Sequence, residues 1–200
     1  MCLGYEVEDK PFLPRVRIWL GEAEKEFDAV FAIQDSLSPS QVLQKVSNRT
    51  VLDNETSPWL HAFQQEHVTR VAFGILALRR HEKQEPAFSW QTHLSPQTDS
   101  RSFEFAFTWG RLCQQRDFLA KLPLLKPRLT KHLQWLQDGV LEVAWPFSQQ
   151  LRVDPNLVSL VRCFDGAKAV RDVFVQSQLE GTISSNVKVS DFASFRDNSA

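Results

Sequence analysis

Apolar residues recur every three or four positions in two stretches of the first half of the chain, as they do in amphipathic helices. Residues 22–33 start with acidic side chains, which favour the first turn of a helix, and continue with Phe27 and Phe31 at helical spacing. Residues 57–80 open with Ser-Pro, carry a broad apolar stripe and end in two arginines, which favour the last turn. The pattern predicts a helix over each stretch.

Shorter elements are predicted around these helices. Residues 38–46 begin with Ser-Pro, an N-cap followed by a proline that suits the first helical position, and they are expected to form a short helix. The polar residues 48–56 are expected to form a loop. Residues 1–20 contain two prolines and, near their end, an alternating apolar pattern, which predicts a strand or an arm packed against another part of the chain.

The apolar period changes after Pro86. Apolar and aromatic side chains alternate over residues 88–92, and they alternate again over residues 103–109, beyond a polar turn. This pattern predicts a β-hairpin with one aromatic face in the core, followed by a helix from about Arg111. A helix over residues 103–119 is the alternative, because some of the same aromatic residues share a helical face.

Two prolines, Pro123 and Pro127, predict a joint between two domains, over residues 1–125 and 126–200. Around this joint, residues 110–132 hold six Lys or Arg side chains and a single acidic one. Runs of like charge mostly lie in water, so a solvated face is the expected role. The alternative is a basic surface that contacts an acidic partner or peptide.

The pattern of the last third of the chain is that of a β-hairpin followed by a third strand. Over residues 133–145, alternating apolar residues flank Asp138-Gly139, a dipeptide that favours a two-residue hairpin turn. Pro146 then interrupts the second strand, and residues 149–153 are expected to form a short third strand.

Helices are predicted to follow these strands. Asp154 and Pro155 supply an N-cap and a first-turn proline, and Gly166 is expected to end this helix in a left-handed conformation. A second helix is expected over residues 167–176 and a third, short one over residues 187–195. Three strands followed by three helices predict a winged-helix unit.

The expected fold class is therefore α+β: a helix-rich N-terminal part with an aromatic hairpin, followed by a winged-helix C-terminal domain. The 200 residues, 42% of them hydrophobic, suffice for a sizeable core. A net charge of -1 and a pI of about 6.5 do not indicate nucleic-acid or membrane binding. The first ten residues lack the pattern of a secretory signal, and the three cysteines match neither a disulfide framework nor a zinc site. A cytoplasmic protein is expected.

The sequence contains no local catalytic or metal-binding motif. Metalloprotease, nucleotide-binding and serine-hydrolase patterns are all missing, and seven glycines leave little room for a phosphate-binding loop. His61 and His67 are expected on different faces of one helix, with His67 in the core. Cys163 lies among apolar residues and is expected to be buried. The chain is predicted not to be an enzyme by itself. The rival interpretation is an active site assembled from distant residues, including these histidines or Cys113.

A winged-helix unit can bind DNA or a peptide, and charge distinguishes the two uses. Recognition of DNA needs a basic helix and a basic face. Residues 151–200 carry six Lys or Arg and six acidic side chains, so they hold no net positive charge. Peptide binding is favoured, and a DNA-binding transcriptional regulator is the alternative.

The predicted strands, the dipeptide DG at 165–166 and the motif VRDV at 170–173 resemble the PqqD-like recognition element of ribosomal-peptide maturation systems. That element holds a leader peptide as an added strand against its third strand and third helix. The resemblance implies a peptide-binding site on the third strand and in a groove beside the third helix. The implied site residues are Gln149, Gln150, Leu151, Arg152, Val153, Val189, Phe192 and Phe195.

A helix-rich front half joined to such an element within 200 residues is similar to the MbnC family, the companion subunits of the methanobactin pathway. Subunits of this family pair with MbnB, a TIM-barrel iron enzyme, and the pair oxidises precursor-peptide cysteines to oxazolone and thioamide groups. The resemblance implies a heterodimer with an MbnB-like partner, with iron in the partner and no cofactor in this chain. Related companion subunits serve other peptide-modifying iron enzymes.

Aromatic side chains bear on the contact with such a partner, because they are enriched in interface cores. The chain has six Trp and fifteen Phe. Residues 57–80 and the aromatic residues of 88–109 are therefore predicted to carry much of the partner contact. Taken singly, each of Trp59, Trp90 and Trp109 is expected to fill the core.

Overall fold

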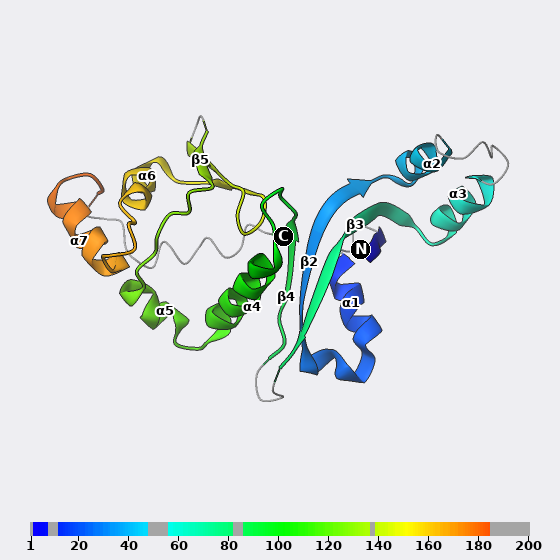
Figure 1. Ribbon diagram of the computed structural model, residues 1–200, viewed down its shortest axis with the longest axis horizontal. Coiled ribbons are helices and arrows are strands. Elements are labelled where there is room, and N and C mark those ends of the chain that lie inside the picture. Colours follow the sequence, from blue (N-terminus) through cyan, green and yellow to red (C-terminus); the bar gives the residue numbers. More distant parts are fainter. Residues whose placement is uncertain (1, 8–11, 48–55, 82–85, 137–138, 185–200) are drawn as a thin grey trace. The chain divides into compact units, whose positions relative to one another are not determined.

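The chain divides into two compact units, Met1–Gly110 and Arg111–Ala200 (Figure 1). Helices and strands occur in both units, so the α+β class expected from the sequence is confirmed. The domain boundary expected after residue 125 falls within the second unit. No helix in the described part of the chain is both long and apolar enough to cross a membrane. The computed structural model describes residues 2–7, 12–47, 56–81, 86–136 and 139–184.

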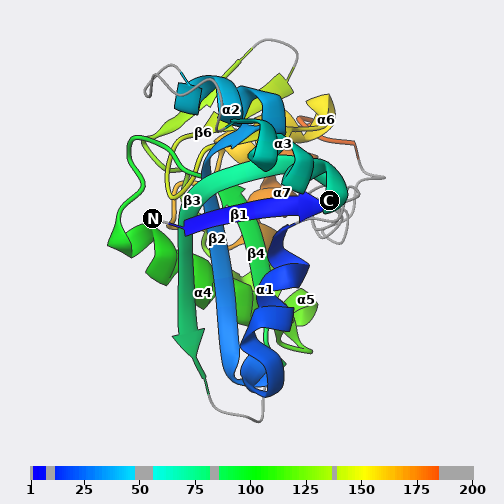
Figure 2. The ribbon, with the colours of Figure 1, turned by 90° about the vertical axis from the view of Figure 1, so that its right-hand side faces the viewer.

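A four-stranded sheet forms the centre of the first unit, with its strands in the order β1-β3-β2-β4 (Figure 2). The central strands are long: β2 spans Phe27–Leu37, β3 spans Val68–Arg80, and the two run antiparallel. β1, Cys2–Val7, pairs antiparallel with β3. β4, Ser89–His93, pairs in parallel with β2. These two strands therefore form the edges of the sheet.

Helices accompany this sheet on both faces (Figure 1). α1 packs on one face through Phe12 and Val16, and α4 lies on the other face, where Phe107 contacts Phe88. α2 and α3 connect the end of β2 to the start of β3. The bounds are Phe12–Leu20 for α1, Gly21–Glu26 for the 3-10 helix η1, Pro39–Ser47 for α2, Thr56–Gln65 for α3 and Ser100–Gln114 for α4.

The middle of β2 is buried on both faces, because the sheet is covered by a helix on each side. All residues from 28 to 33 are buried. The ring of Phe31 points to α1, where its centroid lies 4.5 Å from that of Phe12. Val30, the neighbour of Phe31, points to the opposite face, because side chains alternate along a strand. The core of the first unit thus has two layers.

The helix expected over residues 22–33 is wrong. Only Gly21–Glu26 is helical, in a 3-10 turn, and Phe27–Leu37 is the strand β2. A strand buried on both faces is apolar at nearly every position, so its sequence also satisfies a helical spacing. Because β2 is buried on both sides, its sequence lacks the alternation of apolar and polar residues that identifies a strand.

The long helix expected over residues 57–80 is correct only in its first part. α3 ends at Gln65, and Val68–Arg80 is the strand β3. His67, expected in a helix core, is exposed and has a φ of 52° in the turn between the two elements. The pairing of β3 with β1 and β2 outweighs the helical spacing, because β3 lies in the middle of the sheet.

The expected aromatic hairpin is confirmed only in its first strand, which is β4. Its second strand is part of the helix α4, the alternative for residues 103–119. Residues four apart share a helical face, and the rings of Phe105 and Trp109 are stacked 6.3 Å apart. The polar turn before α4 acts as a cap, because the Asp99 carboxylate accepts the Ser102 N–H at 3.0 Å.

The helix expected over residues 38–46 is confirmed as α2. Its start is a reciprocal cap: the Gln41 N–H donates to Ser38 Oγ at 3.3 Å, and the Ser38 N–H donates to Gln41 Oε1 at 2.8 Å. The alternating residues near the end of residues 1–20 lie in the helix α1 rather than in a strand or arm. Most of the loop expected at 48–56 lies outside the described residues.

The second unit contains a three-stranded antiparallel sheet in the order β5-β6-β7. Its core is formed where Leu141 of the sheet meets Leu157 and Leu160 of α6 and Val173 and Phe174 of α7. The bounds are Phe118–Lys121 for α5, Leu122–Leu124 for the 3-10 helix η2, Leu133–Trp135 for β5, Val140–Val143 for β6, Gln149–Arg152 for β7, Pro155–Arg162 for α6 and Val170–Leu179 for α7.

Most elements expected in this unit are confirmed, including the hairpin, the third strand and two following helices. Gly166 has the left-handed φ expected of it, 82°, but α6 already ends at Arg162. The glycine therefore does not cap α6, and its N–H instead donates to the Pro127 carbonyl at 2.9 Å. The third helix expected over residues 187–195 lies outside the described residues.

Candidate functional site

Strand β7 forms one edge of the second sheet. It contains Gln149–Arg152, which are four of the strand residues expected to bind a peptide. Among the described strands it pairs with β6 alone, with Leu151 opposite Leu141. The side of β7 away from β6 is thus an open strand edge within the part of the chain that the structure describes.

The backbone of β7 presents two residues to this open edge. In an antiparallel pair, residues bonded to the partner strand alternate with residues whose N–H and C=O groups point away from it. The Val153 N–H donates to the Gly139 carbonyl at 2.9 Å, so Leu151, two positions earlier, also bonds toward β6. Gln150 and Arg152 therefore direct their backbone groups away from β6, where an added strand would pair with them.

Leu151 and its neighbours Gln150 and Arg152 lie on opposite faces of β7. Leu151, which is 40% exposed, lies on the face of the buried Leu141 and continues it to the edge. Gln150 lies on the other face, where its amide donates to the Glu142 carboxylate at 3.2 Å. Arg152 is exposed on that same polar face. An added strand would meet an apolar side chain on one face and polar and cationic side chains on the other.

The remaining site residues expected from the sequence lie elsewhere. Val153 is 4% exposed and belongs to the core of the unit. Val189, Phe192 and Phe195 lie outside the described residues. The edge strand is therefore the part of the expected site on which a functional argument rests.

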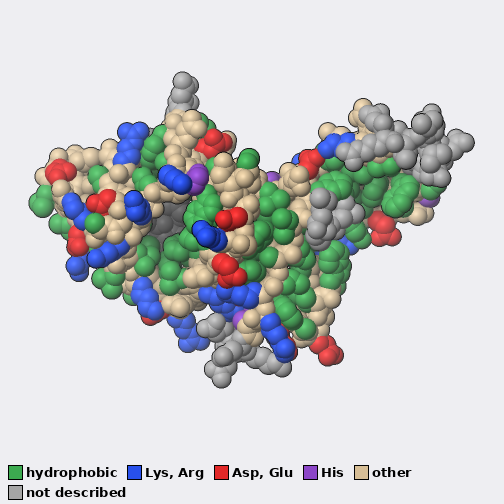
Figure 3. Space-filling model, in the orientation of Figure 1, with side chains coloured by type: hydrophobic (Ala, Val, Ile, Leu, Met, Phe, Trp, Pro, Cys, Tyr) green, Lys and Arg blue, Asp and Glu red, His purple; other side chains and the backbone are tan. Residues whose placement is uncertain are grey.

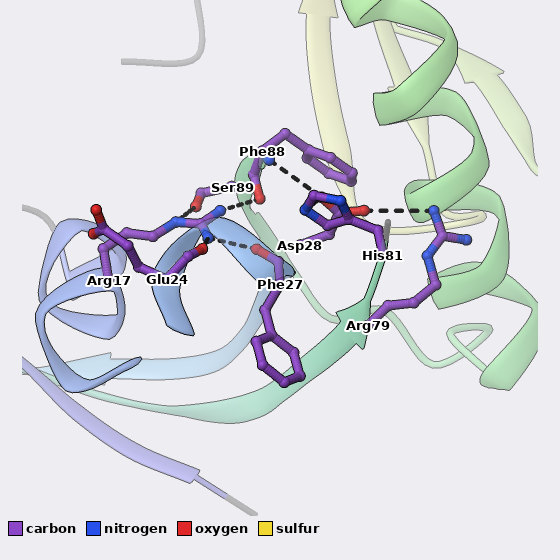
Figure 4. Close-up of polar contacts among 8 residues, drawn as sticks. All are labelled: Arg17, Glu24, Phe27, Asp28, Arg79, His81, Phe88 and Ser89. Carbon is purple, nitrogen blue, oxygen red and sulfur yellow. Dashed lines mark hydrogen bonds and ion pairs between the residues drawn. The ribbon is translucent and has the colours of Figure 1, made fainter. Parts of the chain in front are cut away.

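A cluster of polar side chains lies in the first unit, around the fully buried carboxylate of Asp28 on β2 (Figure 4). This carboxylate accepts the Phe88 N–H at 3.2 Å. Arg79 Nη2 and His81 Nε2 lie 3.6 Å and 3.7 Å from its two oxygens. The Arg79 guanidinium also stacks over the Phe107 ring, 4.6 Å from its centroid. These partners offset the cost of burying a charge.

Arg17 of α1 binds the carbonyl of Phe88, the residue whose N–H donates to Asp28 (Figure 4). Burial lowers the pKa of its guanidinium, and the carboxylates of Asp28 and Glu24 oppose that shift. Since Asp28 accepts the Phe88 N–H and Arg17 donates to the Phe88 carbonyl, the two side chains together fix the start of β4. We assign them to the fold. Arg17 donates to the carbonyls of Phe88, Phe27 (2.5 Å) and Glu24 (2.8 Å) and to Ser89 Oγ (2.7 Å).

Sequence reasoning missed the Asp28 cluster, although one signal for it was present. Asp28 is the one acidic residue within the apolar run 27–33, and a carboxylate there must be paired once the strand is buried. Its partner Arg79 lies directly opposite Asp28 in the β2–β3 register. The sequence pattern predicts a helix over residues 57–80, and a helix there does not allow Arg79 to pair with Asp28 across two strands.

The histidines and cysteines singled out in the sequence lie on different elements. His61 is exposed on α3, and His67 is exposed in the turn before β3. Cys163 is exposed just beyond α6, which corrects the expectation of burial, and its thiol donates to the Ser159 carbonyl at 3.3 Å. Cys113 is half-buried near the end of α4. Within the described residues, no three His, Cys, Asp or Glu side chains are grouped so as to hold a metal ion.

Aromatic residues expected in the core are partly exposed. Trp59, at 63% exposure, lies on α3, and its ring contacts that of Phe63 at 6.5 Å between centroids. Trp109 is exposed on α4, and Trp90 is half-buried on β4. Trp59 escapes burial because α3 connects the ends of β2 and β3 instead of covering the sheet.

No family model matches this chain, and neither does any curated protein or solved structure.

Proposed function

We propose that this chain is a non-catalytic accessory subunit that binds the leader of a ribosomally made precursor peptide. The open edge of β7 is the observation that carries the proposal. The leader adds to the sheet as a further strand, with main-chain bonds to Gln150 and Arg152 and an apolar contact to Leu151. In this proposal the second unit is a winged-helix unit, to which β5, β6 and β7 contribute the strands and α6 and α7 the first two helices.

The accessory role assigns the chemistry to a partner subunit. We take this partner to be an MbnB-like TIM-barrel oxidase that holds iron and converts precursor cysteines to oxazolone and thioamide groups, as in methanobactin biosynthesis. Exposed apolar side chains on α3, Trp59 at 63% and Leu60 at 38%, support a protein interface on the first unit. We place the complex in the cytoplasm, where ribosomal peptides are made.

Co-purification from native cells tests the proposal, because mass spectrometry then identifies the bound peptide and the partner subunit. A fluorescein-labelled synthetic copy of that peptide is next titrated with the chain, and fluorescence anisotropy gives the Kd. We expect a Kd of about 1 μM, roughly -8 kcal/mol, because an extended peptide must be ordered when it binds. A chain that retains neither a peptide nor a partner subunit contradicts the accessory role.

A matched pair of variants at Gln150 tests whether the peptide binds as a strand. Gln150→Pro removes an N–H that points away from β6, so the bonds between β6 and β7 stay intact. Gln150→Ala keeps this N–H and removes only the amide that reaches Glu142. The proline variant should weaken binding at least about tenfold, and the alanine variant less than about threefold. Equal affinities of the two variants, with unchanged circular dichroism, would exclude strand addition at β7.

A further inference from the structure

Two segments far apart in the sequence run side by side in the second unit. Residues 127–129 lie antiparallel to residues 164–166, and Arg128 pairs with Asp165 as an isolated bridge. The backbone hydrogen bonds on either side of this pair measure 3.2 Å and 2.9 Å. Residues 127–129 of the basic run 110–132 are thereby held against the connection between α6 and α7.

Gly166 permits this close approach. Its φ is 82°, and a Cβ at this position would lie 3.1 Å from Arg128 Cβ. Asp165 shapes the same turn, because its carboxylate accepts the Ala167 N–H at 2.8 Å and the Lys168 N–H at 3.3 Å. The conformation of Asp165-Gly166 thus brings the segment that carries Arg128 next to the loop that carries Lys168.

Cationic side chains gather over the second unit as a result (Figure 3). Three side chains from the basic run are joined by one from the end of α6 and one from the following loop. All are exposed, and in the described residues none belongs to an ion pair. The guanidinium of Arg162 is held 5.0 Å from the ring centroid of Trp135 on β5. This basic band consists of Lys126, Arg128, Lys131, Arg162 and Lys168.

We propose that the basic band binds a stretch of clustered carboxylates in the precursor peptide, next to the segment that adds to β7. The proposal rests on the proposed function and extends it to the chemistry of the peptide. The band adjoins β5, which is separated from β7 only by β6. Two strand spacings amount to about 10 Å, which about three extended residues span. The acidic stretch should therefore begin at least about three residues from the strand segment.

Charge favours a short acidic peptide over a nucleic acid as the occupant. The first unit holds 11 Lys or Arg and 15 acidic residues, whereas the second holds 12 and 9. The net charge of the whole chain is -1, which does not attract a long polyanion, whereas the excess of cationic side chains within the second unit suits a few carboxylates.

Anisotropy titrations of the full chain test the band with three labelled probes. These are a short peptide of Glu and Gly, a copy with Gln in place of Glu, and a single-stranded DNA of equal charge. We expect the Glu peptide to bind more tightly than the other two and to lose affinity as salt rises. Tighter binding of the DNA, or equal binding of the Gln copy, would overturn the proposal.

Charge-reversal variants locate the site. Arg128→Glu combined with Lys131→Glu should weaken binding of the Glu peptide at least about tenfold. The matched control, Arg116→Glu combined with Arg171→Glu, changes the same charge outside the band and should cost less than about threefold. Equal losses would mean that net charge alone binds the peptide, and would overturn the site. Circular dichroism checks that each variant folds.

Failure of the band and failure of the leader site can be told apart. Gln150→Pro should leave binding of the Glu peptide unchanged, because that probe does not need the β7 edge. The band variants should leave binding of a leader whose acidic residues are replaced by amides unchanged. If the band variants also weakened binding of this amide-substituted leader, the band would belong to the β7 site. That result would overturn a separate subsite for acidic residues.

Discussion

The two sheets of this chain differ in how completely they are covered. In the first sheet, residues 28–33 of β2 are buried and a helix lies on each face. In the second sheet the strands are only three or four residues long, and residues 150–152 are exposed at its edge. A strand that is buried on both faces has no free surface for a partner, whereas an open edge can pair with another strand.

This difference follows from the chemistry of the strands. β2 is apolar on both faces and carries a charge that only its neighbours can satisfy, so the first sheet depends on internal contacts. β7 is exposed over residues 150–152, and its outward backbone groups do not take part in the pairing with β6. Substitutions in the first sheet should therefore change stability, and substitutions at the β7 edge should change binding.

The largest loss of stability is expected from removing the buried carboxylate of the first sheet. Asp28→Ala leaves the Arg79 guanidinium and the Phe88 N–H without this acceptor, and should cost about 4 kcal/mol of unfolding free energy. Urea denaturation followed by tryptophan fluorescence measures the loss. The matched control on the same strand, Asp35→Ala, removes an exposed ion pair with Lys45 and should cost at most about 1 kcal/mol. Similar losses would contradict the difference between buried and exposed charges.

A glycine in the middle of the first sheet should give the next largest effect. At Gly74 a Cβ would collide with the Ala32 carbonyl across the β2–β3 pair, so Gly74→Ala should cost about 2 kcal/mol. Gly21 has open space around it and a φ of 56°, so Gly21→Ala should cost only about 1 kcal/mol of backbone strain. Hydrogen exchange should show faster opening in peptides from β2 and β3 and no change in β5 to β7. Uniform loss of protection would mean that the two sheets do not unfold independently.

The same two sheets differ in how far they can be predicted from the sequence. In the second unit the dipeptide Asp138-Gly139 and the proline Pro155 are local sequence signals, and each locates an element within a few residues. In the first unit β2 and β3 are buried in the middle of a sheet, so the alternation that marks a strand is absent. Local spacing then favours a helix.

The candidate site shows the same limit. The edge strand β7 follows from turn chemistry and alternation, which are local. The basic band does not, because Arg162 joins the run that contains Arg128 only through the pairing of that run with Asp165. The Asp28 cluster likewise depends on the β2–β3 register. Contacts that depend on tertiary pairing are absent from the local pattern.

The smallest expected effect compares two aspartates, one in each unit, that accept backbone N–H groups. The hydrogen bond from the Ala167 N–H lowers the pKa of Asp165, and the hydrogen bond from the Ser102 N–H lowers the pKa of Asp99. A carboxyl whose pKa is lower in the folded than in the unfolded chain stabilises the fold above the unfolded pKa of about 3.9. That contribution is lost as the pH falls through the folded pKa.

Asparagine at either position keeps an acceptor oxygen and removes the charge, so it isolates this contribution. The difference in Tm between the parent and Asp165→Asn should be largest near neutral pH and should disappear in acid, where the parent carboxyl is also neutral. Asp99→Asn should follow the same course. Because the two aspartates lie in different units, hydrogen exchange should report the first change in peptides at the start of α7 and the second at the start of α4. A Tm difference that persists unchanged in acid would mean that asparagine disturbs the turn itself, since no charge is then left to lose.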